Sequence, residues 1–150
     1  MAIRPAIPAD VPELVALGAR FFAASPFAEV APYDPGAVRA LVEGAMHDGV
    51  VLVALDDVAV VGGIMGVLRG PWFAPSAPCA VELAWWVDEA ARGSVGVRLY
   101  RAFEAWAREH GAVAVVMSDL VVGGDAPAAA LYARLGYTLA ERSHIKRLAA

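Results

Sequence analysis

The stretch that decides the fold reads Val81-Glu82-Leu83-Ala84-Trp85-Trp86-Val87, then Asp88-Glu89-Ala90-Ala91-Arg92-Gly93-Ser94-Val95-Gly96, and continues to His110. Its first part is a short apolar run rich in aromatic residues, which predicts a strand. Its second part is a turn of small residues, and its third part has helical periodicity, with Leu99, Phe103, Trp106 and Ala107 on one face. A helix that begins after such a turn offers free backbone N–H groups and the positive end of its dipole, which together attract phosphate.

The glycine turn has two interpretations: an ordinary tight connection between a strand and a helix, or a site for a pyrophosphate. Its glycines are Gly93 and Gly96, which do not make the G-x-G-x-x-G of a Rossmann fold. No Gly-Lys-Ser/Thr follows, so the turn is not a P-loop either. The rest of the chain has to decide between the two interpretations.

Size and composition favour one domain over residues 1–150, because 150 residues are enough for a sizeable core. The hydrophobic fraction is 59%, but charges interrupt every apolar run before it reaches the length that spans a bilayer. The first five residues lack the apolar region of a secretory signal. The single cysteine, Cys79, fits a reducing compartment. We therefore expect a soluble, cytoplasmic protein with no membrane partner.

The charge pattern further limits the classes of molecule that this chain is expected to bind. The net charge is −4 and no basic block occurs, which argues against a nucleic-acid surface. Mild acidity is compatible with a small cationic substrate. Three scattered histidines and one cysteine make no zinc spacing, so we expect no metal.

The flanking segments predict an α/β chain of the mixed α+β kind. Asp10 is expected to cap a first helix, with Pro12 in its first turn and Glu13 closing a capping box. Asp34 is expected to start a second helix. Strands are expected at residues 3–6, 50–55, 58–68, 81–87 and 112–120, a short helix at 127–135, and a final strand or two at 137–148. The pattern indicates a central mixed sheet of about six to seven strands flanked by about four helices.

This element order and two motifs resemble the GNAT superfamily of acyl-CoA-dependent N-acetyltransferases over essentially the whole chain. The segment from Glu82 to His110 looks like the family's acetyl-CoA motif. Residues 125–137, D-A-P-A-A-A-L-Y-A-R-L-G-Y, are similar to the family's Asn-x-x-Ala-x-x-Leu-Tyr followed by Gly-Phe or Gly-Tyr. This second match is the more specific one, and the resemblance implies a GNAT-like three-layer fold.

The chain departs from the family pattern at the pyrophosphate loop, which usually reads Arg/Gln-x-x-Gly-x-Gly/Ala. If Arg92 is aligned with the family's first position, Val95 and Val97 replace the two small residues. If Gly96 is aligned with the last glycine, Ser94 replaces the earlier glycine, and this second register is preferred. Asp125 stands in place of the family's Asn, which keeps a helix cap and lacks an amide donor.

The resemblance implies transfer of an acetyl group from acetyl-CoA, as co-substrate, to a primary amine of a small molecule or peptide, directly within a ternary complex. Backbone groups of Trp86, Val87 and Asp88 are then expected to meet the pantetheine. The pyrophosphate and the rest of the cofactor are expected at Arg92, Gly93, Ser94, Val95, Gly96 and Asp125. The alternative function is a non-catalytic acyl-CoA sensor or interaction module of the same fold.

The chemistry needs a base, because an alkylammonium with a pKa of about 10.4 is no nucleophile until it loses a proton. Glu82 is the candidate base, since a carboxylate on an apolar strand is partly desolvated and its pKa rises. Strand alternation puts Glu82 on the face of Ala84 and Trp86, opposite Leu83 and Trp85. The alternative is a salt-bridged or solvent-facing strand residue.

Tyr132 is the candidate acid that protonates the leaving thiolate, and the alternative is a core tyrosine. Tyr137 is expected to be structural and to close the sheet after Gly136. The loops at residues 25–35 and 70–78 are weakly patterned, so the identity of the amine stays open. Trp72 and Phe73 in the second loop form either a lid over the core or a wall facing the substrate. A homodimer is compatible with a final strand at a free sheet edge.

Overall fold

The computed structural model describes residues 1–121 and 128–148. The α-helices are α1 (Val11–Ala23), α2 (Pro35–Asp48), α3 (Ser94–Glu109) and α4 (Ala129–Arg134), and three short 3-10 helices lie at Pro8–Asp10, Pro26–Glu29 and Glu89–Ala91. The strands are β1 (Ala2–Pro5), β2 (Gly49–Asp56), β3 (Ala59–Arg69), β4 (Cys79–Val87) and β5 (Ala114–Val116). Asp125 lies outside the described residues.

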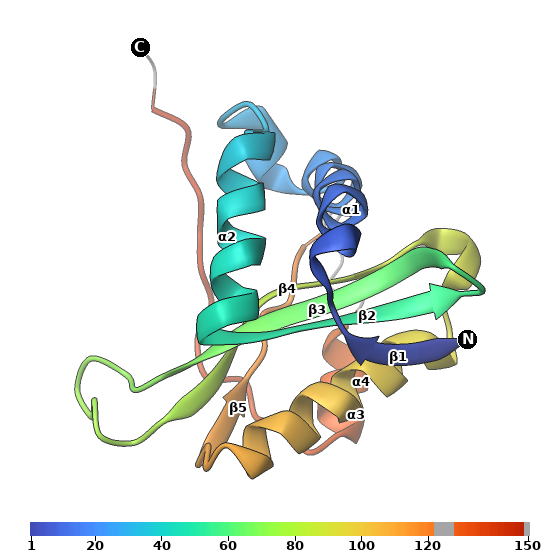
Figure 1. The fold of residues 1–150 in the computed structure, drawn as a ribbon. Coiled ribbons are helices and arrows are strands. Elements are labelled where there is room, and N and C mark those ends of the chain that lie inside the picture. The colour runs from blue at the N-terminus through green and yellow to red at the C-terminus, as the bar shows by residue number, and fades with distance from the viewer. Residues whose placement is uncertain (122–127, 149–150) are drawn as a thin grey trace.

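The strands form one sheet in the order β1-β2-β3-β4-β5. The pairs from β1 to β4 are antiparallel, and β5 joins β4 in parallel. Helices α1 and α2 lie on one face of this sheet and α3 with α4 on the other (Figure 1). The expected mixed α/β class, the hairpin and the crossover through α3 are therefore confirmed.

Two apolar clusters fill the two sides of the sheet. On one side, Leu14 and Leu17 of α1 pack with Val42 of α2 on β2 and β3. On the other side, Leu99 and Phe103 of α3 are fully buried against the sheet. This close packing needs Gly66 on β3, because a Cβ there would lie 2.6 Å from the Phe103 ring.

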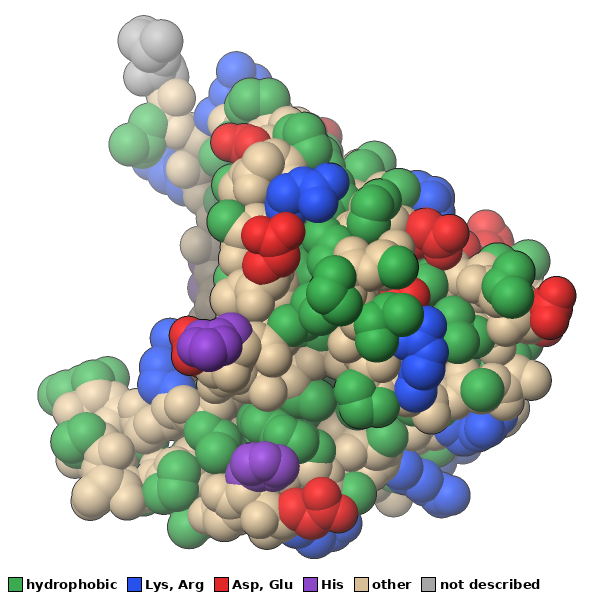
Figure 2. Space-filling view, viewed as in Figure 1, with side chains coloured by type: hydrophobic (Ala, Val, Ile, Leu, Met, Phe, Trp, Pro, Cys, Tyr) green, Lys and Arg blue, Asp and Glu red, His purple; other side chains and the backbone are tan. Residues whose placement is uncertain are grey.

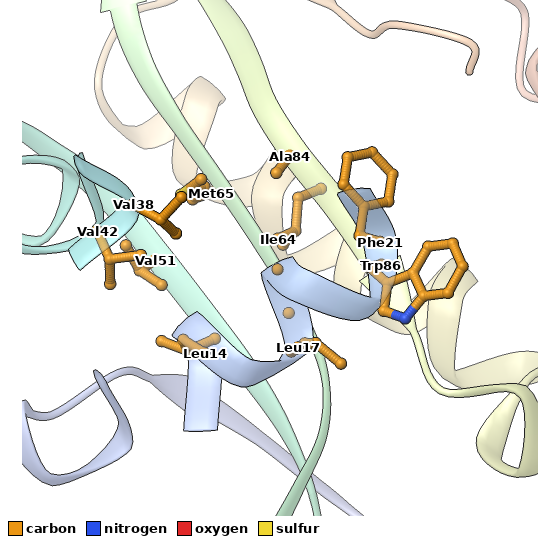
Figure 3. Close-up of a pocket in the computed structure, with 12 residues that line it drawn as sticks. Leu14, Leu17, Phe21, Val38, Val42, Val51, Ile64, Met65, Ala84 and Trp86 are labelled. Atoms are coloured by element: carbon orange, nitrogen blue, oxygen red, sulfur yellow. The ribbon is translucent and has the colours of Figure 1, made fainter. Parts of the chain in front are cut away.

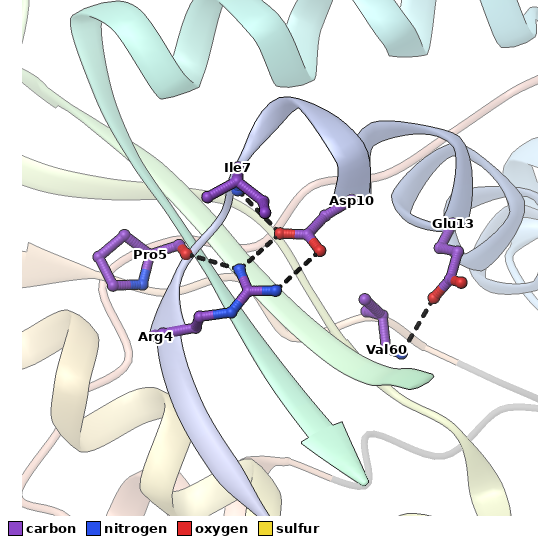
Figure 4. A network of polar contacts seen from close by, with 6 residues as sticks. All are labelled: Arg4, Pro5, Ile7, Asp10, Glu13 and Val60. Carbon is purple, nitrogen blue, oxygen red and sulfur yellow. Dashed lines mark hydrogen bonds and ion pairs between the residues drawn. The ribbon is translucent and has the colours of Figure 1, made fainter. Parts of the chain in front are cut away.

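The first helix begins differently from the prediction. Asp10 accepts no hydrogen bond as the cap of α1; its carboxylate binds the Arg4 guanidinium at 2.7 and 3.0 Å and accepts the Ile7 N–H at 2.8 Å (Figure 4). Glu13 accepts the Val60 N–H at 3.0 Å instead of closing a capping box. Both carboxylates therefore tie the start of α1 to β1 and β3.

The second helix starts as expected. Asp34 Oδ1 accepts the N–H groups of Gly36 and Ala37 at 2.9 and 3.0 Å, which satisfies two free donors of the first turn of α2. Pro35 occupies the first helical position, where its missing N–H is harmless.

The predicted final strand is wrong, because described residues 137–148 contain no strand and the sheet has five strands. Strand β5 also covers only three of the nine residues expected. Residues 141–148 mix charged residues with isolated apolar ones, and Leu139 and Leu148 are 68% and 80% exposed. Such a segment has no apolar face to bury on a sheet.

The visible face of the molecule carries acidic and basic side chains interspersed, while hydrophobic side chains reach the surface between α1 and α2 (Figure 2). Trp72 and Phe73 are 92% and 72% exposed, so in this structure they cover no core. None of the described helices has both the length and the apolar character needed to cross a membrane.

Candidate active site

The sheet diverges near one edge, between β4 and the last strand, β5. These parallel strands pair only where residues 79–81 meet residues 114–116. From Glu82 onward, the β5 side of β4 has no strand partner among the described residues. The backbone groups of this edge are therefore available to another molecule. We call this place the fork.

A β-bulge sits beside the fork. Ala84 pairs with Met65 and Glu82 pairs with the next residue, Gly66, so Leu83 is the extra residue on β4. A bulge interrupts the alternation of side chains between the two faces.

The bulge makes the predicted face of Glu82 wrong. Gly66, its cross-strand partner, faces Phe103 on the α3 side of the sheet. Trp85 also packs on this side, whereas Ala84 and Trp86 line a cavity with residues of α1 and α2. Glu82 therefore shares its face with Trp85, opposite Ala84 and Trp86.

Glu82 is buried at the fork, with 8% of its surface exposed. Its Oε2 accepts the backbone N–H of Ser118, which follows β5, at 3.0 Å. Burial raises the pKa of Glu82 to about 7, although the hydrogen bond from Ser118 favours the ionised form. Glu82 has no salt-bridge partner among the described residues and does not face solvent, and near neutral pH it can both accept and release a proton.

Tyr132 of α4 reaches the same place. It is 8% exposed, and its hydroxyl donates to the carbonyl oxygen of Ser118 at 2.8 Å. Burial raises the pKa of the phenol, and the negative charges of Glu82 and Asp119 raise it further. The structure therefore brings the two predicted catalytic residues together at Ser118. Glu82 accepts the backbone N–H of Ser118, and Tyr132 donates to its carbonyl oxygen.

An aromatic cluster supports Tyr132. Its ring lies 6.1 Å from Trp85 and 5.4 Å from Tyr137, and Tyr137 lies 5.9 Å from Tyr100 of α3. Tyr137 therefore contributes packing as expected, although it packs on α3 and α4 and closes no sheet.

Sequence reasoning missed Ser118 and Asp119. Asp119 Oδ1 is buried with no hydrogen-bond partner among the described residues. In the structure β5 ends at Val116, so both residues follow the carboxyl end of a parallel strand, where ligands of open α/β sheets bind. The sequence carried no such signal, because the expected strand at 112–120 included both residues.

The turn after β4 is held by side chains and backbone together. The Arg92 guanidinium lies 5.1 Å above the Trp86 ring, and its Nε donates to the Val87 carbonyl at 3.4 Å. The Asp88 N–H donates to the Val61 carbonyl at 2.9 Å, and its carboxylate binds Arg20 of α1 at 3.0 Å through both oxygens. Several groups expected to meet a cofactor therefore already have partners within the chain, and Arg20 is an ion-pair partner that the sequence did not indicate.

The start of α3 offers its backbone. Gly93 precedes the helix with φ +115°, a conformation that favours glycine, and no side chain caps the first turn. Ser94 is exposed, whereas the Val95 side chain is 5% exposed in the core. A Cβ on Gly96 would lie 3.3 Å from the Trp85 ring, so packing explains this glycine. A 16-residue helix with an uncapped, exposed N-terminus fits an anionic group such as a pyrophosphate.

An apolar cavity of about 50 Å³ lies between α1, α2 and the sheet (Figure 3). Phe21 meets the Trp86 ring edge-on at 5.3 Å in its wall. The remaining lining is aliphatic or small and includes Leu14, Leu17, Val38, Val42, Met65 and Ala84. Elsewhere, the described residues contain no group of three His, Cys, Asp or Glu side chains placed to hold a metal.

Solved structures with the same fold are numerous. A mutant of the BH1408 protein from Bacillus halodurans matches with a TM-score of 0.81 and 20% identity, covering 99% of this chain and 100% of that one. The aminoglycoside acetyltransferase AAC(6')-Iy, in complex with the bisubstrate analog CoA-S-monomethyl-acetylneamine, matches with a TM-score of 0.74 and 16% identity, covering 99% and 98%. The aminoglycoside 6'-N-acetyltransferase AAC(6')-IG from Acinetobacter haemolyticus matches with a TM-score of 0.70 and 17% identity, covering 100% and 99%. These identities establish a shared fold.

A search of curated proteins found no match. The family model for the acetyltransferase (GNAT) family matches residues 19–137, which include the fork, the turn and α3. This chain therefore belongs to the GNAT family of acetyltransferases.

Proposed function

We propose that this chain transfers an acetyl group from acetyl-CoA to a primary amine, directly within a ternary complex. The single observation that carries the proposal is the buried Glu82 carboxylate at the fork. Glu82 and Tyr132 both bind the backbone of Ser118, Glu82 at its N–H and Tyr132 at its carbonyl oxygen. Acetyl-CoA would supply the activated acetyl group as a thioester. The chain's own residues would position the two substrates and move the protons.

Glu82 would accept a proton from the bound ammonium. Because its pKa lies at about 7, half of the carboxylates are ionised at neutral pH, and each can hold the proton during the transfer. A glutamate with an ordinary pKa would be a weaker base for this step.

Tyr132 would give its proton to the departing thiolate. Its hydroxyl now donates to Ser118, and a rotation of the hydroxyl hydrogen would redirect the same proton. The raised pKa keeps the phenol protonated at neutral pH, as a proton donor requires. After the transfer, the phenolate would take up the proton that Glu82 accepted from the ammonium, which would return both residues to their starting states.

The turn and α3 would hold the diphosphate of the co-substrate. The backbone N–H groups of Ser94, Val95 and Gly96 lie in the first turn of α3 and have no partner within the helix. Backbone groups on the β5 side of β4 would meet the pantetheine where the strands diverge. The exposed, uncapped start of α3 supports this diphosphate site, and Asp125 would contribute to cofactor binding.

The test mixes the chain with acetyl-CoA and a panel of primary amines, and measures free thiol together with acetylated amine by mass spectrometry. Equal amounts of both products, with a strong loss in Glu82→Gln, would support the proposal. Acetyl-CoA binding without turnover on any amine would favour the sensor, and absence of binding would remove both functions.

A further inference from the structure

We propose that residues 138–148, called the arm below, pair with the outer edge of β5 in a second copy of this chain. Two copies exchange their arms, so that each arm adds a strand to the sheet of the other copy. Within a single chain the arm forms no strand. This inference concerns assembly and does not depend on the proposed acetyl transfer.

The arm has no partner among the described residues of its own chain. All of its residues are exposed, and it leaves the domain as an open chain without helix, strand or turn (Figure 1). The backbone hydrogen bonds outside helices and strands end at Tyr137. Ordering such a chain costs conformational entropy, which contacts with a partner would offset. The arm is therefore available to another molecule.

Strand β5 offers a surface that accepts a strand. It is the last strand of the sheet, and its outer side has no strand partner in the part of the chain that the structure describes. Unpaired backbone groups at such an edge readily bind another strand. A groove of about 420 Å³ lies beside this edge, between α3 and residues 135–138. A strand added to β5 would place alternate side chains over this groove.

Exposed apolar side chains border the same edge. Val113, directly before β5, and Val116, at its end, are 69% and 44% exposed. The loop that carries the exposed Trp72 and Phe73 ends at Pro78, whose carbonyl accepts the Val113 N–H at 2.8 Å. Loop and strand therefore form one apolar border along the edge, and a bound partner would remove it from water.

The arm matches this edge in side chains and in charge. Its exposed apolar residues, Leu139, Ile145 and Leu148, can pack on the apolar border. Pairing at an edge is made by backbone groups, so the charged residues between them can stay in water. The arm carries three basic residues and one acidic residue, whereas the rest of the chain has nine basic and fifteen acidic ones. The arm is therefore attracted to the body of another copy.

The direction of the chain favours the edge of a second copy over the edge of the same chain. The Tyr137 ring lies 5.9 Å from Tyr100 and 5.4 Å from Tyr132, and its N–H donates to the Tyr132 carbonyl at 3.0 Å. These contacts hold the start of the arm, which from there runs away from its own β5 (Figure 1). A second copy has the same edge and the same arm, so one two-fold exchange satisfies both chains.

The first experiment is a cross-linking test on full-length chains that carry Cys79→Ala, which removes the single native cysteine. One batch also carries Val116→Cys on β5 and the other Ile145→Cys on the arm. The two batches are unfolded in urea, refolded together and treated with a short bismaleimide. We expect a covalent pair made of one chain from each batch, identified by mass spectrometry.

The matched control replaces Val116→Cys by Val58→Cys, which lies exposed in the turn between β2 and β3, away from β5. It should give far less of the mixed pair. Equal yields with Val58→Cys, or no mixed pair with Val116→Cys, would overturn the inference. A chain that carries both Val116→Cys and Ile145→Cys tests the single-chain alternative, and a link formed only within this chain would also overturn the exchange.

The second experiment measures the size of the particle by sedimentation velocity. Wild type should sediment as a dimer, and a variant that ends at Tyr137 should sediment as a monomer. The helix signal of the shortened variant in circular dichroism should stay the same, because the arm contains no helix. A wild type that stays monomeric at high micromolar concentration, or a dimer that persists without the arm, would contradict the exchange. The cross-linking test uses the full chain, so it decides the question even where the shortened variant does not fold.

Discussion

Replacing Glu82 by glutamine should make the protein more stable and nearly inactive at the same time. Burial raises the pKa of Glu82 from 4.5 to about 7, so the folded chain keeps this proton up to a higher pH than the unfolded chain. Wild-type stability therefore falls as the pH rises between about 4.5 and 7. The difference between these two pKa values corresponds to about 3 kcal/mol, by which the ionised carboxylate lowers the free energy of unfolding at pH 8.

The Glu82→Gln variant removes this penalty, because its neutral amide oxygen can still accept the Ser118 N–H. We expect its free energy of unfolding at pH 8 to exceed that of wild type by about 3 kcal/mol, or its Tm by about 6–12 °C. At pH 5 the difference should shrink to below about 1 kcal/mol. Urea unfolding at both pH values measures it, with Glu43→Gln on the exposed side of α2 as the matched control.

Activity should change in the opposite direction. In wild type, kcat should rise about tenfold from pH 5 to pH 6 and level off above pH 8, because Glu82 must be ionised to act as the base. Glu82→Gln should lose roughly 100-fold or more in kcat, together with this acid limb. Equal stability of both proteins at pH 8 would refute the buried, ionised carboxylate, and an unchanged pH profile would refute its role as base.

Three further predictions concern other parts of the chain. Tyr132→Phe should lower kcat by roughly 100-fold while the Kd for acetyl-CoA, measured by calorimetry, changes by less than about twofold; equal losses in both would remove the role as acid. Gly93→Ala should lower the free energy of unfolding by about 1–3 kcal/mol in urea, because φ is +115° there, and an unchanged midpoint would contradict this backbone conformation. Asp34→Ala should remove the cap of α2 and lower stability by about 1 kcal/mol. Asp10→Ala should leave the helix content of α1 unchanged, since the Asp10 side chain caps no N–H group of α1. Circular dichroism and urea unfolding measure both.

Local patterns predicted most of the fold. The apolar run before the glycine turn and the periodicity of Leu99 and Phe103 predicted β4 and α3, since both depend on residues close in sequence. The placement of Asp34 before Pro35 predicted the start of α2 for the same reason. The final strand was predicted wrongly, because a strand depends on a pairing partner far along the chain.

Part of the candidate site could be predicted from the sequence. A lone glutamate between apolar residues predicted the burial of Glu82, and the tyrosine motif pointed to Tyr132. The bulge at Leu83 could not be predicted, because it arises from the register between β3 and β4. The contacts with Ser118 join segments separated by 36 and 14 residues, and no local pattern encodes such contacts.

The central claim is that the thioester co-substrate binds at the fork, with its diphosphate at the start of α3. The most direct measurement is a titration with acetyl-CoA that follows the backbone amide signals of the whole chain by NMR. Saturable shifts concentrated at residues 83–87 and 93–96 would support the account. Signals that stay in place there at millimolar acetyl-CoA would contradict it.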